Sequence, residues 1–214
     1  MEKKVNQHRQ RDEERLEGKR KAFLFLGGNL ALDLVNTEIM VRGKRVDLLR
    51  TPQDAVRWWE MARQTHPQDR RDQQERIWDE RQLADLRALR QTLRNLFEAL
   101  TTQGRVQERD IRALNVVLQE GYYALALTPE GKALAVYQAR EGQEGAIELS
   151  IAFAALSLLK TQDLSRLHAC QNERCMLLFY DTTRSATRHW CRVACTNRAR
   201  SRQNYRRAKE APPS

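Results

Sequence analysis

The stretch CQNERCMLLFYDTTRSATRHWCRVAC, residues 170–195, contains all four cysteines of this 214-residue chain. They form two close pairs, Cys170-x4-Cys175 and Cys191-x3-Cys195, with 15 residues between the pairs. Each pair can supply two thiolates to one ion, and four thiolates complete the tetrahedral shell that Zn²⁺ prefers in structural sites. We therefore predict one structural zinc ion, with Cys170, Cys175, Cys191 and Cys195 as its ligands.

Alternative roles for these cysteines remain open at this point. His168 and His189 lie near the pairs and are rival ligands, while metal-free thiols or two disulfides would leave the module without an ion. Four thiolates leave no coordination position for a substrate water, and the signature of the zinc deaminases is absent from the sequence. A Gly-rich phosphate loop, a nucleophile elbow and an HExxH motif are absent too, so we expect a protein that is not an enzyme.

Positive charge gathers in the same part of the chain. The formal net charge is +10, and residues 160–214 carry 12 Lys and Arg against 4 Asp and Glu, whereas the rest carries 26 against 24. Such a concentration of charge indicates a surface directed at a polyanion. Apolar runs stay short of the roughly 20 residues of a membrane-spanning helix, and residues 1–21 lack the apolar segment of a secretory signal. We expect a cytoplasmic protein without a membrane partner, in a compartment where thiols stay reduced.

The segment after the last cysteine, TNRARSRQNYRRAK at 196–209, is expected to form a helix. At about 100° per residue, four of its cations fall within an arc of about 80°. Cys195 would fix the start of this helix through the metal and leave the basic face free for double-stranded DNA. A solvated, charged terminus is the alternative. The residues predicted to contact DNA are Arg184, Arg188, Arg192, Arg198, Arg202, Arg206 and Lys209.

The sequence before the cysteines predicts a mainly α fold with a small β-hairpin. Leucines three or four residues apart make one apolar stripe over 79–100, which is typical of an amphipathic helix. Further helices are expected over 30–37, 52–61, near 110 and over 144–159, followed by one turn from Asp163. Strand-like runs at 122–127 and 133–137 predict the hairpin, 176–180 one arm of another, and 42–45 a turn before 46–49.

These elements divide the chain into a mobile charged tail (1–21), a helical N-terminal domain (22–160), a small four-cysteine module ending in a basic helix (161–210) and a short end (211–214). A polar group within the first domain is a candidate pocket for a small-molecule effector. Its members are Asp33, Asn36, Thr37, Arg90 and Arg94. The alternative is that these side chains cap a helix or pair with acids on the surface.

Several motifs together resemble a known pair of domains. Cys170-x4-Cys175, LLFYDTTRSATRHWC at 177–191 and the closing Cys-Thr-Asn-Arg at 195–198 resemble the CGNR zinc finger, with Thr196 in place of the glycine and His189 where arginine is more usual. GGNLALDLVNT at 27–37, VDLLRTPQDAVRWW at 46–59 and LRALRQTLRNLFEAL at 86–100 resemble the ABATE domain that normally precedes this finger. The resemblance covers about residues 23–209. It implies zinc at the four cysteines, DNA as partner, and a stress-induced transcription regulator in bacteria.

The sequence thus favours a zinc-dependent, DNA-binding transcription regulator whose first domain is a sensor or a homodimerisation unit. Two alternatives use the same basic module: an RNA-binding or ribosome-associated protein, and a protein-interaction adaptor.

Overall fold

The structure is a computed structural model that describes residues 23–66, 78–129, 131–142 and 147–210, except for the side chains of Thr161, Ala208 and Glu210. The expected tail 1–21, the end 211–214 and the first residues of the helix expected from 144 lie outside the described residues.

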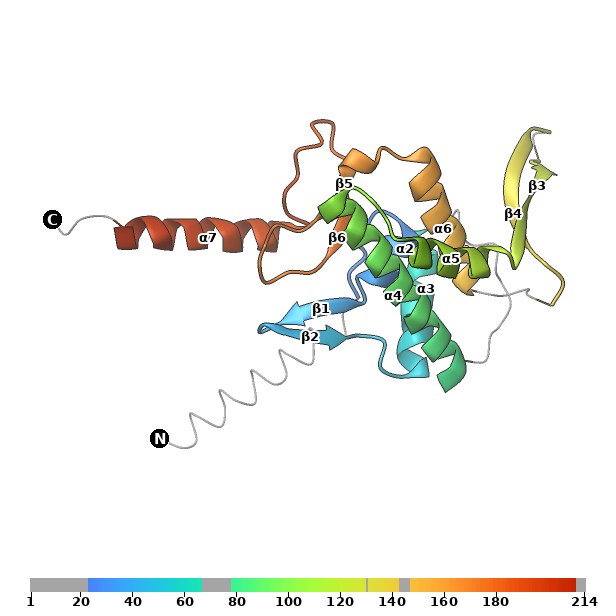
Figure 1. Cartoon of the computed structure of the whole chain (residues 1–214), viewed down its shortest axis with the longest axis horizontal. Coiled ribbons are helices and arrows are strands. Elements are labelled where there is room, and N and C mark those ends of the chain that lie inside the picture. The colour runs from blue at the N-terminus through green and yellow to red at the C-terminus, as the bar shows by residue number, and fades with distance from the viewer. Residues whose placement is uncertain (1–22, 67–77, 130, 143–146, 211–214) are drawn as a thin grey trace.

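Over the described ranges, the chain forms helices and three small antiparallel strand pairs (Figure 1). The helices are α2 (Leu30–Val35), α3 (Pro52–Thr65), α4 (Glu80–Gln103), α5 (Glu108–Leu118), α6 (Ile147–Thr161) and α7 (Val193–Glu210), with a 3-10 turn η2 (Leu164–Arg166). The strand pairs are β1 (Glu38–Val41) with β2 (Lys44–Asp47), β3 (Gly121–Leu127) with β4 (Ala133–Ala139), and β5 (Leu167–Ala169) with β6 (Leu178–Tyr180). The fold is therefore mixed, with helices as its main part.

Local sequence sets where the longer helices begin and end. Thr51 and Asp54 form a capping box at the start of α3, with Pro52 in the first position. Asp79 and Gln82 do the same for α4, which ends at Gly104 in the left-handed conformation. The leucine stripe of α4 is buried along its length, so the amphipathic pattern correctly predicts the core-facing side.

Two elements differ from the expectations, the turn at 42–45 and the start of the last helix. Residues 42–45 do not form a simple turn: Arg42 and Gly43, both at positive φ, make the turn of a hairpin, and Lys44 already belongs to strand β2. This strand was missed because its first two residues are exposed cations, which hide the apolar alternation of a strand. The last helix begins at Val193, inside the second cysteine pair, and α6 is described from Ile147.

One apolar core unites both parts of the chain. Helix α2 is wholly buried, and it packs against α4, α6 and β6. Leu177, Leu178 and Phe179 of the cysteine module belong to the same core as the leucines of α2 and α4. The module is thus docked on the N-terminal part, while α7 projects from one end of the body and the β3–β4 hairpin from the other (Figure 1). Within the described residues, the helices are too short or too polar to span a bilayer.

Candidate metal centre and nucleic-acid interface

The four cysteines converge on one point at the base of α7. Cys170 follows β5, Cys175 lies in the loop before β6, and Cys195 lies in the first turn of α7. All four sulfur atoms lie within 4.8 Å of one another, and the Cys175–Cys191 and Cys191–Cys195 Sγ distances are both 3.8 Å. Four Zn–S bonds of about 2.3 Å in a tetrahedron require sulfur–sulfur distances of about 3.8 Å. The thiols are free and therefore fit one zinc ion.

The rival histidines lie against aromatic rings. The His168 ring packs on Phe179 at a centroid distance of 5.6 Å, and the His189 ring packs on Trp190 at the same distance. Within the described part of the chain, the group of side chains that could hold a metal ion consists of the four cysteines.

Crowding among the thiols shows why a cation belongs there. Hydrogen bonds from Cys175 and Cys191 lower the pKa of Cys170 to about 2. The hydrogen bond to Cys170 raises the pKa of Cys175 to about 12, and the pKa of Cys191 is raised by its hydrogen bonds to Cys170 and Cys175. The thiolate of Cys170 is thus stabilised at the expense of the thiolates of Cys175 and Cys191, and a divalent ion among these sulfur atoms would compensate their negative charge.

Asn172 ties the two cysteine loops together, a role that the sequence reasoning missed. Its backbone C=O accepts a hydrogen bond from the Cys175 N–H (2.7 Å), and its side chain accepts one from the Arg174 N–H (3.0 Å). Its amide also donates to the C=O of Cys195 in α7 (3.1 Å). An asparagine inside a short cysteine loop is the available sequence signal, because such residues commonly bond backbone two positions on.

Asp181 organises the longer loop between the cysteine pairs. Its Oδ1 accepts hydrogen bonds from the N–H (2.9 Å) and the hydroxyl (2.7 Å) of Thr183, and its Oδ2 accepts one from the Arg188 N–H (2.8 Å). Burial disfavours the charged carboxylate, but these hydrogen bonds and the charge of Arg188 hold the pKa of Asp181 at about 2. The sequence signal for this role is the Asp-x-Thr pattern of an Asx turn.

The predicted DNA contacts fall into two groups. Five side chains are exposed: Arg184 in the loop, and Arg198, Arg202, Arg206 and Lys209 on α7. Arg188 and Arg192 are half-buried. The Arg188 guanidinium donates to the C=O of Cys191 (2.8 Å) and lies 4.9 Å from the centre of the Phe179 ring, so it braces the metal centre from within the module. That any of the seven contacts DNA stays a prediction.

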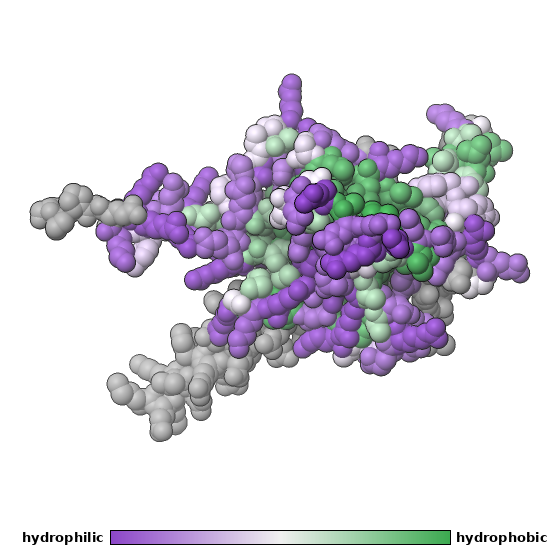
Figure 2. All heavy atoms as spheres, in the orientation of Figure 1, coloured by the Kyte–Doolittle hydropathy of each residue, from purple (hydrophilic) through white to green (hydrophobic). Residues whose placement is uncertain are grey.

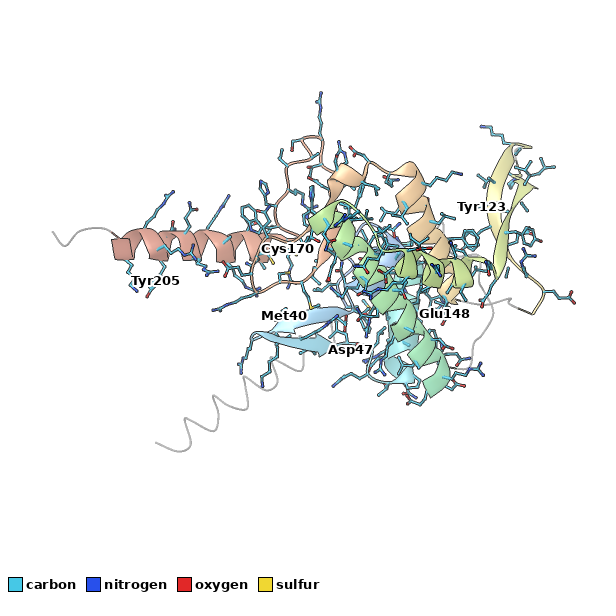
Figure 3. All side chains as sticks on the ribbon, viewed as in Figure 1. Met40, Asp47, Tyr123, Glu148, Cys170 and Tyr205 are labelled. Carbon is cyan, nitrogen blue, oxygen red and sulfur yellow. The ribbon has the colours of Figure 1, made fainter. Side chains whose placement is uncertain are left out.

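A basic groove of about 760 Å³ runs between residues 171–174 and α7. Arg198, Arg202, Tyr205 and Arg206 line its helical side. Figure 3 places Cys170 where α7 meets the body and Tyr205 farther out along the helix. Glu173, which the sequence reasoning did not single out, faces this groove and forms an ion pair with Arg202. The hydrogen bond and charge of Arg202 lower the pKa of Glu173. This carboxylate is therefore ionised and would compete with a phosphate group for the Arg202 guanidinium.

The five residues considered as an effector pocket are all buried. Arg90 donates to Asp47 and to the hydroxyl of Thr37, and Arg94 donates to Glu38 and to the C=O of Val35. The two guanidinium groups are buried, whereas these acidic partners range from buried Glu38 to half-buried Asp47.

The other two candidates are also engaged with protein atoms. Asp33 accepts a hydrogen bond from the Gly27 N–H and lies 2.7 Å from His66 Nε2; burial raises its pKa in spite of these contacts. Asn36 donates to the C=O of Leu178 (2.8 Å) and accepts from its N–H (2.9 Å), so it locks α2 to β6. An effector at this cluster stays a prediction.

Two family models match the chain. Residues 28–162 match ABATE, described as "Putative stress-induced transcription regulator", and residues 166–208 match the CGNR zinc finger. A search of curated proteins finds no match. The resemblance read from the sequence is thereby confirmed, and both matches are regulatory or zinc-finger types and not known enzymes. The CGNR match and the four clustered thiols together identify one structural Zn²⁺ as the cofactor.

Proposed function

Because this chain belongs to the ABATE family and carries a CGNR zinc finger, we propose that it is a transcription regulator that binds double-stranded DNA through the basic face of α7. The observation that carries the proposal is geometric: α7 presents its aligned cations to solvent, and its first turn holds a zinc ligand. In this proposal, residues 161–210 are the DNA-binding unit, and residues 22–160 are a sensor or dimerisation unit. The protein acts in the cytoplasm and has no catalytic activity of its own.

The metal centre gives α7 a fixed starting point. Bound zinc compensates the charge of four thiolates and joins the loops that carry them. Asn172 holds the C=O of Cys195, and Arg188 holds that of Cys191, so the backbone on both sides of the α7 start is anchored. This anchoring matters because the outer part of α7 is exposed on all sides and has no apolar face to pack.

The exposed part of α7 suits the major groove of B-DNA. Its 18 residues span about 27 Å at about 1.5 Å each, and the groove is about 12 Å wide, enough to admit a helix. Arg198, Arg202, Arg206 and Lys209 would then contact phosphates or the guanine edge. The groove between residues 171–174 and α7 offers room for the sugar–phosphate backbone of one DNA strand along this face of the helix.

RNA is the second candidate partner, since the same cations attract any polyanion. The deep, narrow major groove of A-form RNA does not admit a helix, and single-strand readers stack bases on several aromatic rings. Tyr205 is the only aromatic residue in 193–210, which favours duplex DNA. A protein-interaction adaptor remains a weaker alternative, because its surface would need more apolar area than α7 presents.

The test is a fluorescence-anisotropy titration of the zinc-loaded, full-length protein against a labelled random-sequence DNA duplex at low and moderate salt. Unlabelled DNA duplex and RNA duplex of the same length then compete. We expect salt-sensitive binding that the DNA displaces at much lower concentration than the RNA. Equal or better competition by RNA would transfer the proposal to RNA, and no binding at low salt would overturn it.

A further inference from the structure

The β3–β4 hairpin exposes apolar side chains far from α7. Leu125 and Leu127 are each 79% exposed, Tyr123 50%, Leu134 48% and Tyr122 44%. Figure 1 shows the hairpin standing clear of the body, and Figure 2 shows hydrophobic residues gathered on it. Single exposed apolar residues are common, but a contiguous group on a projecting element marks an interaction surface.

The base of the hairpin is firmly attached, so the exposed part is held in place. Tyr123 meets the Phe153 ring of α6 edge-on at 5.1 Å, and Tyr137 stacks on the same ring at 4.7 Å. At Gly121, a Cβ atom would come within 2.8 Å of Phe153, so the strand approaches α6 as closely as a backbone can. In Figure 3, Tyr123 lies on the side of the hairpin that faces α6.

Beyond this base, both faces of the hairpin are apolar. The register pairs Leu125 with Ala135 and Leu127 with Ala133, which places these four side chains on one face. Leu134 and Ala126 pair on the opposite face. A two-stranded ribbon also leaves one free edge on each strand, and an uncovered apolar edge invites pairing with another strand.

A second copy of the chain is the occupant that the charges favour. The net charge is +10, yet residues 121–139 contain only one acid and one base, Glu130 and Lys132, and in sequence both fall between the two strands. Because most of this charge lies on residues 160–214, two cationic molecules repel each other least when they approach through a neutral element outside that part of the chain. The free strand edge is also self-complementary around a two-fold axis, as a symmetric dimer requires.

The available area is of the right size. With the aromatic figure of about 150–250 Å² per side chain taken as an upper value for leucine as well, the exposed fractions of the three leucines and two tyrosines amount to at most roughly 450–750 Å² per copy, and the exposed alanines add to this. A standard stable interface uses about 800 Å² per partner.

We propose that two copies of this chain form a two-fold dimer through the β3–β4 hairpin, with Leu125, Leu127 and Leu134 in the interface. This inference rests on the dimerisation role of the N-terminal part within the proposed function, but it does not require that α7 binds DNA. Because α7 projects from the opposite end of the body, both basic helices stay free at the outer ends of such a dimer (Figure 1). The dimer would then engage two separated DNA segments and not one shared groove.

Sedimentation velocity of the full-length, zinc-loaded protein without nucleic acid tests the proposal. We expect the wild type to sediment as a dimer and Leu125→Lys to sediment as a monomer with an unchanged circular-dichroism spectrum. Val116→Lys is the matched control. Val116 is 63% exposed on α5, outside the hairpin, and its replacement by lysine adds the same charge as Leu125→Lys. This control should remain dimeric.

A milder variant keeps the test decisive if Leu125→Lys fails to fold. Leu125→Ala with Leu127→Ala preserves the neutral hairpin and should raise the dimer dissociation constant at least tenfold. A monomeric wild type, a Leu125→Lys dimer, or equal weakening by Val116→Lys would overturn the proposal, as would a monomer that binds anionic vesicles through the hairpin. A wild-type dimer that does not bind DNA would contradict the DNA-binding proposal and leave the dimer proposal intact.

Discussion

Asp181 is a buried carboxylate that holds the loop between the cysteine pairs without touching the metal. Three hydrogen bonds converge on its two oxygens, and its own N–H donates to the C=O of Arg166 (2.8 Å). Because only the ionised form can accept all three, loop order and carboxylate charge are coupled.

We predict that Asp181→Asn destabilises the zinc-loaded protein at pH 7. The folded pKa of Asp181, about 2, lies below its ordinary value of about 3.9, so its contribution is complete above about pH 4 and is lost as the pH falls toward 2. Urea denaturation over a pH series should show a lower free energy of unfolding for the variant than for the wild type, and this difference should shrink as the pH falls from about 4 toward 2. Asp163→Asn is the control, since asparagine also caps η2. Equal stability of Asp181→Asn and wild type at pH 7 would refute the role.

Glu173 limits the charge that α7 presents. Its ion pair with Arg202 must open before that arginine can bind a phosphate. We predict that Glu173→Gln raises affinity for duplex DNA about two- to fivefold, a size typical of exposed ion pairs. Anisotropy titration measures this, with Glu108→Gln as control, because Glu108 forms a similar exposed pair with Arg112 on α5. An unchanged or reduced affinity would show that DNA does not approach Arg202.

At the scale of elements, Asn36 joins α2 to strand β6. Its side chain donates a hydrogen bond to the C=O of Leu178 and accepts one from the N–H of Leu178, and both residues are buried. Asn36→Ala leaves a buried N–H and a buried C=O of Leu178 unpaired, and each costs about 1–3 kcal/mol, so we predict a loss of about 2–6 kcal/mol in the free energy of unfolding.

The same variant should also speed zinc loss, because β6 lies between the cysteine pairs. Urea denaturation and the rate of zinc transfer to a colorimetric chelator measure the two effects. Asn115→Ala, on the exposed side of α5, should change neither quantity. Wild-type zinc release by Asn36→Ala would mean that the module holds its metal independently of α2.

The sequence predicts these elements unevenly. Cysteine spacing correctly indicated the metal ligands, and the leucine stripe correctly indicated α4, since both patterns are local. The β1–β2 hairpin was missed because β2 begins with exposed cations, and the Asn36–Leu178 lock was missed because its partners lie 142 residues apart. Arg94 illustrates the same limit. Glu98 is an i,i+4 partner within α4, but the other partners of Arg94 come from α2, β1 and the loop before β6, and no periodicity relates those to it.

The whole molecule shares one core, so zinc removal should affect more than the cysteine module. With Cys170, Cys191 and Cys195 buried in the common core, we predict one cooperative transition at a lower Tm after chelation. Hydrogen exchange should show lost protection in β5 and β6 and reduced protection in α2. Cys175→Ser should reproduce the effect, and full protection of α2 in zinc-free protein would contradict a shared core.

In the proposed function, the metal centre orients α7 so that one face of this helix contacts duplex DNA. Arg202 and Arg206 lie on that face, whereas Arg200 and Arg207 are exposed on the opposite side of the same helix. The double variants Arg202→Ala/Arg206→Ala and Arg200→Ala/Arg207→Ala therefore each remove two positive charges from α7, but from opposite faces of the helix.

Anisotropy titration of these two variants against one DNA duplex over a salt series is the most direct measurement. We predict that Arg202→Ala/Arg206→Ala lowers the affinity for DNA at least tenfold. The slope of log K against log salt concentration should also become shallower by about 2, because two phosphate contacts disappear. Arg200→Ala/Arg207→Ala should lose less than about threefold, since its charges act only at long range. Equal losses in both variants would mean diffuse attraction without an oriented helix, and no loss in either would remove α7 from the interface.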